Sequence, residues 1–221
     1  YGMDESFELN VGEFIDFANQ KKAKIVLVSN PNNPTGRSIP LESVLEIVEK
    51  VDGIVVLDEA YIEFGGESAI DYVEKYDNLV VLRTFSKAIA LAGIRLGYLV
   101  AGDELTSYVK RVKSPYNVNV LSQEMGLKVF NKLETIVDNI QVIKDERIKL
   151  EKALGEMGLR VVPSDANFVL FKCNQDLWET LVSEGVLIRQ FGGDLAGYYR
   201  ITVGTESENI MAIESLRRSL K

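Results

Sequence analysis

The sequence predicts an α/β fold: a mostly parallel sheet with helices on both faces, followed by a smaller α+β unit. Two observations carry this prediction. In the first half of the chain, short apolar runs rich in β-branched residues alternate with segments of helical periodicity, which is typical of parallel strands joined by crossover helices. From about residue 103, long helical stretches replace this alternation, and strand-like runs return only near residue 159.

Four apolar runs in the first half are predicted to be strands. The first three lack the polar alternation of a half-exposed strand, so we expect a sheet that is covered on both faces. A helix is predicted between the first two, because apolar residues from Leu41 to Val48 share one helical face and Pro40 suits a helix start. The four strands are expected at Ile25–Val28, Ile54–Leu57, Leu79–Leu82 and Leu96–Val100.

The second half predicts several helices followed by a small mixed unit. One helical stretch carries an apolar stripe from Leu133 to Ile143, which we expect to pack in the core or between domains. Short strands are expected at 159–162, 167–171, 186–189 and 199–203, with helices near 175–184 and 206–220. We therefore divide the chain into a large unit at 1–115, connecting helices at 116–150 and a small C-terminal domain at 151–221.

The composition excludes several classes of function. The chain has no histidine and a single cysteine, Cys173, so serine–histidine triads, cysteine–histidine dyads and histidine metal sites are excluded, and no metal is expected. A net charge of −8 without a basic cluster argues against a nucleic-acid partner. No apolar run approaches the roughly 18 residues of a membrane span, and no signal peptide is recognised, so we expect a cytoplasmic protein without a membrane partner.

Polar segments follow each of the first three predicted strands. The first strand leads into NPNNPTG at 30–36, the second into DEAY at 58–61 and the third into RTFSK at 83–87. Each segment alone also fits a turn, a helix cap or a surface lysine. Ligands of open α/β sheets bind beyond the carboxyl ends of the strands, however, so the convergence of the three segments on one edge favours a ligand site there.

The residue types at this edge match what a pyridoxal phosphate cofactor requires. Lys87 can form the covalent bond to the cofactor aldehyde, and Asp58 can pair with the pyridinium nitrogen. Asn33 and Tyr61 can donate to the oxygen on the cofactor ring. The phosphate needs hydroxyl donors and a fork-shaped cation, for which the candidates are Thr84, Ser86 and Arg95.

Four motifs, in this order, resemble those of fold-type I aminotransferases, which use pyridoxal phosphate: NPNNPTG, LDEAYIEF, RTFSKAIALAGIRLGY and YYRITVGT. They are most similar to the histidinol-phosphate aminotransferase branch, and PYNVNVLSQ at 115–123 adds to this similarity. The resemblance covers essentially all 221 residues. It implies that residues 1–115 belong to the cofactor-binding large domain and that residues 151–221 form the small domain.

The resemblance also implies a role for each matching residue. Lys87 would hold the cofactor and move a proton between the substrate's α-carbon and the cofactor's C4′, with Asp58 on the ring nitrogen and Tyr61 on the ring oxygen. Arg200, in the last motif, is implied to bind the anionic group of the substrate. Arg189 and Tyr116 are candidates to help it, and a structural role is open for each.

Some features of the family have no counterpart before Asn30. These are an N-terminal arm, a glycine-containing phosphate cup, an aromatic residue that stacks on the ring, and a tyrosine that reaches the neighbouring subunit. The chain also starts at Tyr1 rather than at a methionine. We therefore expect the C-terminal three-fifths of a longer parent, which forms a homodimer with its active sites at the interface, and we expect this chain alone to lack a complete site. The Asn33–Pro34 peptide is expected to be cis.

The implied reaction is amino transfer between L-histidinol phosphate and 2-oxoglutarate, giving imidazole acetol phosphate and glutamate in histidine biosynthesis. Alternatives within the fold are a threonine-phosphate decarboxylase and an aminotransferase of aromatic amino acids. An alternative of another class is an aminotransferase-like domain that senses a ligand for a regulator, which the acidic charge disfavours. A relic without cofactor is disfavoured by the joint presence of the candidate site residues.

Overall fold

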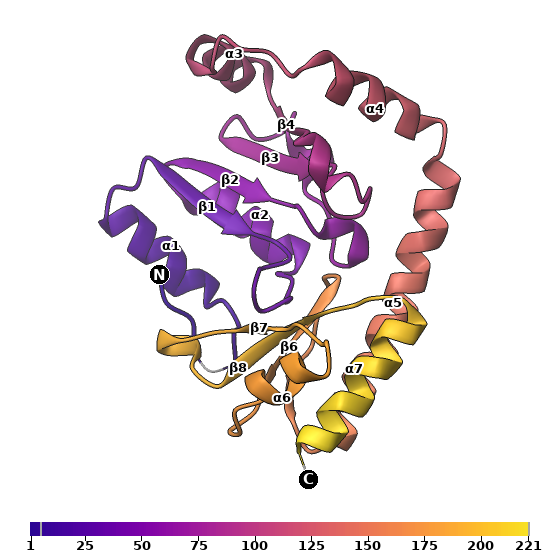
Figure 1. The fold of residues 1–221 in the computed structure, drawn as a ribbon. Helices are drawn as coiled ribbons and strands as arrows, with labels where there is room; N and C mark the ends of the chain where they lie inside the picture. Colours follow the sequence, from indigo (N-terminus) through magenta and orange to yellow (C-terminus); the bar gives the residue numbers. More distant parts are fainter. Residues whose placement is uncertain (5, 221) are drawn as a thin grey trace.

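The computed structural model describes residues 1–4 and 6–220 and confirms the α/β fold class (Figure 1). Four strands form a first sheet in the order β1-β2-β3-β4. The strands β1 to β3 are parallel and β4 is antiparallel to β3, so the sheet is mostly parallel, as predicted. The four strands are β1 (Ile25–Ser29), β2 (Ile54–Asp58), β3 (Leu79–Thr84) and β4 (Gly97–Ala101).

Two helices, α1 (Val11–Gln20) and α2 (Leu41–Lys50), cover one face of this sheet and form a core with the inward side chains of β1, β2 and β3. Side chains alternate along a strand, so Ile25 and Leu27 point to the other face, where they are 61% and 67% exposed. The expectation of a sheet covered on both faces is therefore wrong for β1 within the described residues, because α1 and α2 pack on the same face.

Three helices follow the first sheet: α3 (Asp103–Val112), α4 (Val120–Phe130) and α5 (Leu133–Glu156). Figure 1 shows α5 running from α4 along the side of the molecule to the second sheet. The predicted apolar stripe of α5 is only partly core: Ile140 and Ile143 pack on buried clusters, whereas Leu133 and Val137 are exposed. Because α5 continues past residue 150, the division between the last two predicted domains falls inside a helix, and the domain division stays a prediction.

The C-terminal part is an antiparallel sheet in the order β5-β6-β8-β7. Its core is built from β6, β8, the end of α5 and two further helices. The predicted strand at 186–189 is wrong: β7 begins at Arg189, because only Arg189 and Gln190 pair with β8. The elements are β5 (Arg160–Val162), β6 (Phe168–Lys172), α6 (Trp178–Ser183), β7 (Arg189–Gln190), β8 (Tyr198–Thr202) and α7 (Glu206–Ser219), and the short 3₁₀ turns of the chain are η1 (Ile62–Phe64), η2 (Ile70–Tyr72), η3 (Ala92–Ile94) and η4 (Gly193–Leu195).

The two sheets are joined at the loops that follow β1 and β2. Arg147 on α5 is buried and donates one hydrogen bond to the Phe64 carbonyl, 3.1 Å away, and one to the Ala166 carbonyl, 2.8 Å away. The amide of Asp165 donates to the Gly36 carbonyl at 2.7 Å. The small unit is thereby held against the carboxyl edge of the first sheet, where the candidate site lies. None of the helices in the described part of the chain is long and apolar enough to cross a membrane.

Candidate active site

The loop after β1 carries Asn33 to the carboxyl edge of the sheet. The buried side chain of Asn30 fastens this loop, since it accepts a hydrogen bond from the Ile39 amide at 2.7 Å and donates to the Ile39 carbonyl at 3.3 Å. The Asn33–Pro34 peptide is cis, which confirms the prediction, and the Asn30–Pro31 peptide is also cis.

Asp58 and Tyr61 come from the end of β2 and the turn that follows it. The Asp58 carboxylate accepts a hydrogen bond from the Ala60 amide at 3.1 Å. Tyr61 is buried, and its hydroxyl accepts from the Asn33 side-chain amide at 3.4 Å. The Lys87 ammonium, delivered by the segment after β3, lies 5.2 Å from the centroid of the Tyr61 ring. Three of the predicted cofactor residues, Asn33, Tyr61 and Lys87, therefore meet as expected.

Arg200 on β8 joins this cluster from the second sheet. Its Nη1 donates to Asn33 Oδ1 at 2.6 Å, and its guanidinium lies 4.9 Å from the centroid of the Phe168 ring. Phe168 meets Tyr61 edge-on, with ring centroids 5.2 Å apart and an interplanar angle of 89°. The Nε of Arg200 is buried and has no hydrogen-bond partner in the described structure. Arg200 thus contacts the same amide that contacts Tyr61, and it retains an unused donor.

Of the three predicted phosphate ligands, Thr84 ends β3, and Ser86 and Arg95 follow this strand. Thr84 Oγ1 accepts a hydrogen bond from the Ser86 amide at 3.0 Å, which folds the chain between β3 and Lys87. Arg95 is exposed, and its Nη1 donates to the Ala92 carbonyl at 3.1 Å. Its φ of 51° places it in the left-handed region, which is uncommon for a residue other than glycine and is found at functional sites.

The two predicted helpers of Arg200 lie apart from the cluster. Arg189 is the register partner of Arg200 on the edge strand β7, where it is exposed and stacks on Phe191 with 5.8 Å between the guanidinium and the ring centroid. Tyr116 is 87% exposed in the segment between α3 and α4. Within the described residues, no hydrogen bond or ring contact joins either of them to Asn33, Tyr61 or Lys87.

Sequence reasoning missed Phe168, which contacts the cluster, and Glu59 and Arg83, which adjoin predicted site residues along the chain. Phe168 provides the surface on which the Arg200 guanidinium lies, and its place at the start of an apolar run marked it only as core. Glu59 and Arg83 stand inside the motifs DEAY and RTFSK, and each directly precedes or follows a predicted site residue. Their adjacency to Asp58 and Thr84 was the available signal.

Comparison with known proteins shows the family of this chain. Residues 3–216 match the family described as aminotransferase class I and II. The chain belongs to this family. Histidinol-phosphate aminotransferase of Caldanaerobacter subterraneus subsp. tengcongensis is 42% identical over 223 residues, which cover 99% of this chain and 63% of that protein. The chain thus spans about 63% of the length of this curated relative.

Solved structures of the aminotransferase fold superpose on this chain. The histidinol-phosphate aminotransferase of Clostridium acetobutylicum superposes with a TM-score of 0.90 at 26% identity, covering 98% of this chain and 69% of that chain. The L-threonine-O-3-phosphate decarboxylase of Porphyromonas gingivalis superposes with a TM-score of 0.84 at 27% identity, covering 97% and 68%. Both of these solved proteins are named for phosphorylated amino compounds.

The side chains of this aminotransferase-family chain fit a pyridoxal phosphate cofactor. An amine, a carboxylate and a paired amide and phenol stand at one sheet edge, and the buried unpartnered Nε of Arg200 shows that the cluster has a donor left over. These groups match the aldehyde, the ring nitrogen, the ring oxygen and a substrate anion. Within residues 1–4 and 6–220, no three histidine, cysteine, aspartate or glutamate side chains gather as metal ligands do.

Proposed function

We propose that this chain forms the cofactor edge and small domain of a pyridoxal-phosphate-dependent aminotransferase. One observation carries the proposal: Arg200 of the second sheet and Tyr61 of the first both bind the side chain of Asn33, beside the amine of Lys87. A side chain for the cofactor ring (Tyr61), a side chain for the substrate's anionic group (Arg200) and a proton carrier (Lys87) therefore lie close enough together to contact one small molecule. The matched family supports this proposal.

In the proposed reaction, pyridoxal phosphate supplies an electron sink that stabilises negative charge on the substrate's α-carbon. Lys87 would hold the cofactor at its aldehyde carbon, and its amine, once displaced by the substrate's amine, would carry the proton between the α-carbon and C4′. Asp58 keeps the ring nitrogen protonated, while Asn33 and Tyr61 donate to the ring oxygen. Thr84, Ser86 and Arg95 are proposed to bind the phosphate, and Arg200 to bind the anionic group of the substrate, with Arg189 and Tyr116 as further candidates.

The proposed substrates are L-histidinol phosphate and 2-oxoglutarate, because the curated relative at 42% identity is a histidinol-phosphate aminotransferase. A second candidate is decarboxylation of threonine phosphate, which the Porphyromonas gingivalis structure favours. Product analysis separates the two: amino transfer yields glutamate, whereas decarboxylation yields carbon dioxide and an amino-alcohol phosphate.

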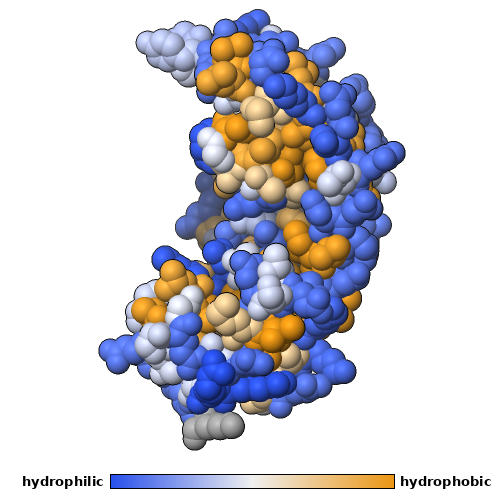
Figure 2. All heavy atoms as spheres, turned by 45° about the vertical axis from the view of Figure 1, so that its right-hand side comes forward, coloured by the Kyte–Doolittle hydropathy of each residue, from blue (hydrophilic) through white to orange (hydrophobic). Residues whose placement is uncertain are grey.

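We further propose that the parent protein is a homodimer. Apolar side chains gather in the upper part of the face in Figure 2, towards the end of the molecule that carries α4. In α4, Val120, Leu121 and Leu127 are more than half exposed, with Met125 at 41%. Burial of such side chains against a second copy would remove apolar area from water, which stabilises association.

The test uses the full-length protein that carries this chain. Purified protein is mixed with L-histidinol phosphate and 2-oxoglutarate, and glutamate is measured, with threonine phosphate and phenylalanine as competing amino donors. Glutamate formation that is fastest with histidinol phosphate supports the proposal. Release of carbon dioxide from threonine phosphate without glutamate formation contradicts it and favours the decarboxylase.

A further inference from the structure

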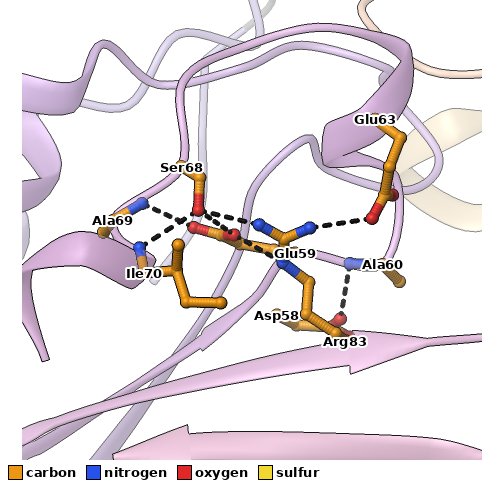
Figure 3. A network of polar contacts seen from close by, with 8 residues as sticks. All are labelled: Asp58, Glu59, Ala60, Glu63, Ser68, Ala69, Ile70 and Arg83. Atoms are coloured by element: carbon orange, nitrogen blue, oxygen red, sulfur yellow. Dashed lines mark hydrogen bonds and ion pairs between the residues drawn. The ribbon is translucent and has the colours of Figure 1, made fainter.

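Behind the carboxyl edge of the first sheet lies a network of charged and polar side chains that the proposed reaction does not use. Figure 3 shows its centre, the guanidinium of Arg83, between the side chains of Glu59, Glu63 and Ser68. Arg83 Nε lies 2.9 Å from Glu59 Oε2, Nη1 lies 2.7 Å from Glu63 Oε1, and Nη2 donates to Ser68 Oγ at 2.8 Å. A planar guanidinium can hold three such partners in fixed directions at once.

Every side-chain oxygen of Glu59 and Ser68 has a partner in this network. The Glu59 side chain is fully buried, and its two carboxylate oxygens accept from the Ala69 amide at 2.8 Å and from Ser68 Oγ at 2.7 Å, besides the contact with Arg83. Ser68 Oγ also accepts from the Ile70 amide at 3.0 Å. A buried charge is tolerated only when it is paired and hydrogen-bonded, so this arrangement fixes the three side chains together.

The network and the candidate site lie on opposite faces of the sheet edge. Asp58 is the register partner of Leu82, one position before Glu59 and Arg83. Because side chains alternate along strands, Glu59 and Arg83 point to the face of α1 and α2, beyond the buried Leu57 and Val81, while Asp58 points the other way. The network therefore reaches the site through the backbone.

The network ties segment 59–63, which contains Tyr61 and directly follows Asp58, to Arg83 near the end of β3. Glu59 directly follows Asp58, and Glu63 lies two residues after Tyr61. Arg83 binds both glutamates from the neighbouring strand, and it directly precedes Thr84. Side-chain contacts with Arg83 thus hold both ends of segment 59–63 beside the end of β3.

We propose that Arg83 and Glu59 are positioning residues, which set Asp58 and Tyr61 towards the cofactor ring by fixing the backbone of residues 58–63. The inference rests on the proposed function, because it assigns these residues to that site. A misplacement of about 1 Å at a catalytic group can lower a rate by about 100-fold, so a network of this kind affects catalysis without touching the cofactor.

The test replaces the pair by neutral side chains of similar size in the full-length protein. The double variant E59Q/R83M leaves no unpaired buried charge, and the double variant E184Q/R218M is its matched control. Like Arg83, Arg218 binds both a carboxylate and a serine: its Nε and Nη2 donate to Glu184, and Nη2 also donates to the Ser215 hydroxyl. This group lies in the small unit, away from the cluster. A third variant, R83K, keeps the charge but cannot bind three partners in one plane.

Three quantities are measured for each variant: hydrogen exchange of the backbone amides along the whole chain in cofactor-free protein, the Kd for pyridoxal phosphate, and kcat with KM for the amino donor. In E59Q/R83M we expect faster exchange confined to 58–70, a Kd and kcat poorer by about 10- to 100-fold, and an unchanged KM, because Arg200 lies outside the network. R83K is expected to fall between this variant and the wild type, and E184Q/R218M to match the wild type.

Wild-type cofactor affinity and kcat in E59Q/R83M would overturn the inference, as would exchange that rises equally throughout the chain. If the double variant does not fold, R83K decides between the same outcomes. The Kd for pyridoxal phosphate is measured first for the wild-type protein. If the wild-type protein binds no pyridoxal phosphate, the proposed function itself is contradicted.

Discussion

Arg200 and Asn33, 167 positions apart in the sequence, are joined by a hydrogen bond of 2.6 Å from Nη1 to Oδ1. This contact connects the second sheet to the loop that follows the first strand of the first sheet. Because Asn33 also donates to the Tyr61 hydroxyl, its side chain joins Arg200 of the second sheet to Tyr61, which follows β2 of the first.

Lys87 is expected to carry the cofactor. Its ammonium lies over the Tyr61 ring in the cluster, whereas the lysines of α3 and its end, Lys110 and Lys113, are exposed. Borohydride reduction of the holoenzyme followed by peptide mapping should place the pyridoxyl group on Lys87. Lys87→Ala should abolish turnover and retain some cofactor through phosphate contacts. A label on Lys110 or Lys113 would contradict the assignment.

Asp58→Asn is expected to lower kcat and leave the fold intact. The amide oxygen of asparagine can still accept from the Ala60 N–H, now 3.1 Å from the carboxylate, but it cannot balance a protonated ring nitrogen. Loss of such a charge-assisted hydrogen bond costs about 1.5–3 kcal/mol, or roughly a 10- to 150-fold lower rate. Steady-state kinetics measure the loss, with the exposed Asp71→Asn as control. Near-normal turnover would leave Asp58 with only its structural contact.

The part of the site that lies on parallel strands could be predicted from the sequence. Asn33, Tyr61 and Lys87 each follow a β-branched apolar run, and parallel strands bring their carboxyl ends to one edge. The docking of Arg200 depends on how the second sheet packs, which periodicity does not reveal, and only the family resemblance pointed to it. Arg83 was not predicted although its motif was recognised, because the sequence does not tell a partly buried arginine with three partners from a surface arginine.

Arg147→Met is expected to weaken the junction of the two sheets. The substitution removes two charge-assisted hydrogen bonds and leaves the carbonyls of Phe64 and Ala166 without this donor. We expect the free energy of unfolding to fall by about 2–4 kcal/mol. Urea denaturation measures the change. Lys152→Met on the same helix, whose ammonium is exposed and lies 3.9 Å from Glu156, is the control and should change stability little.

Glu146 is expected to make stability depend on acid. The hydrogen bond from Lys149, and then that from Asn209, holds the pKa of its carboxyl below the ordinary value of 4.5. A group whose pKa is lower in the folded than in the unfolded state stabilises the fold above the unfolded pKa, and this contribution is lost as the pH falls through the folded value. Urea midpoints between pH 7 and pH 3 should therefore fall less steeply in Glu146→Gln than in the wild type. The exposed Glu179→Gln is the control, and identical slopes for all three proteins would refute the prediction.

Arg200→Lys is expected to weaken binding of both the amino donor and the 2-oxo acid. The guanidinium of Arg200 lies over the Phe168 ring and is bound to Asn33, and its buried Nε has no partner in the described structure, so a donor is left for an anion. A lysine is a point charge that cannot form two parallel hydrogen bonds with a carboxylate or phosphate. The loss of one such bond costs about 1.5–3 kcal/mol, so KM for both substrates should rise about tenfold or more, while borohydride labelling of Lys87 stays unchanged.

Arg189→Lys is the matched control, because Arg189 is the register partner of Arg200 but is exposed on β7. If Arg189→Lys raises both constants and Arg200→Lys raises neither, then the substrate anion binds at the edge strand and Arg200 serves only to hold Asn33.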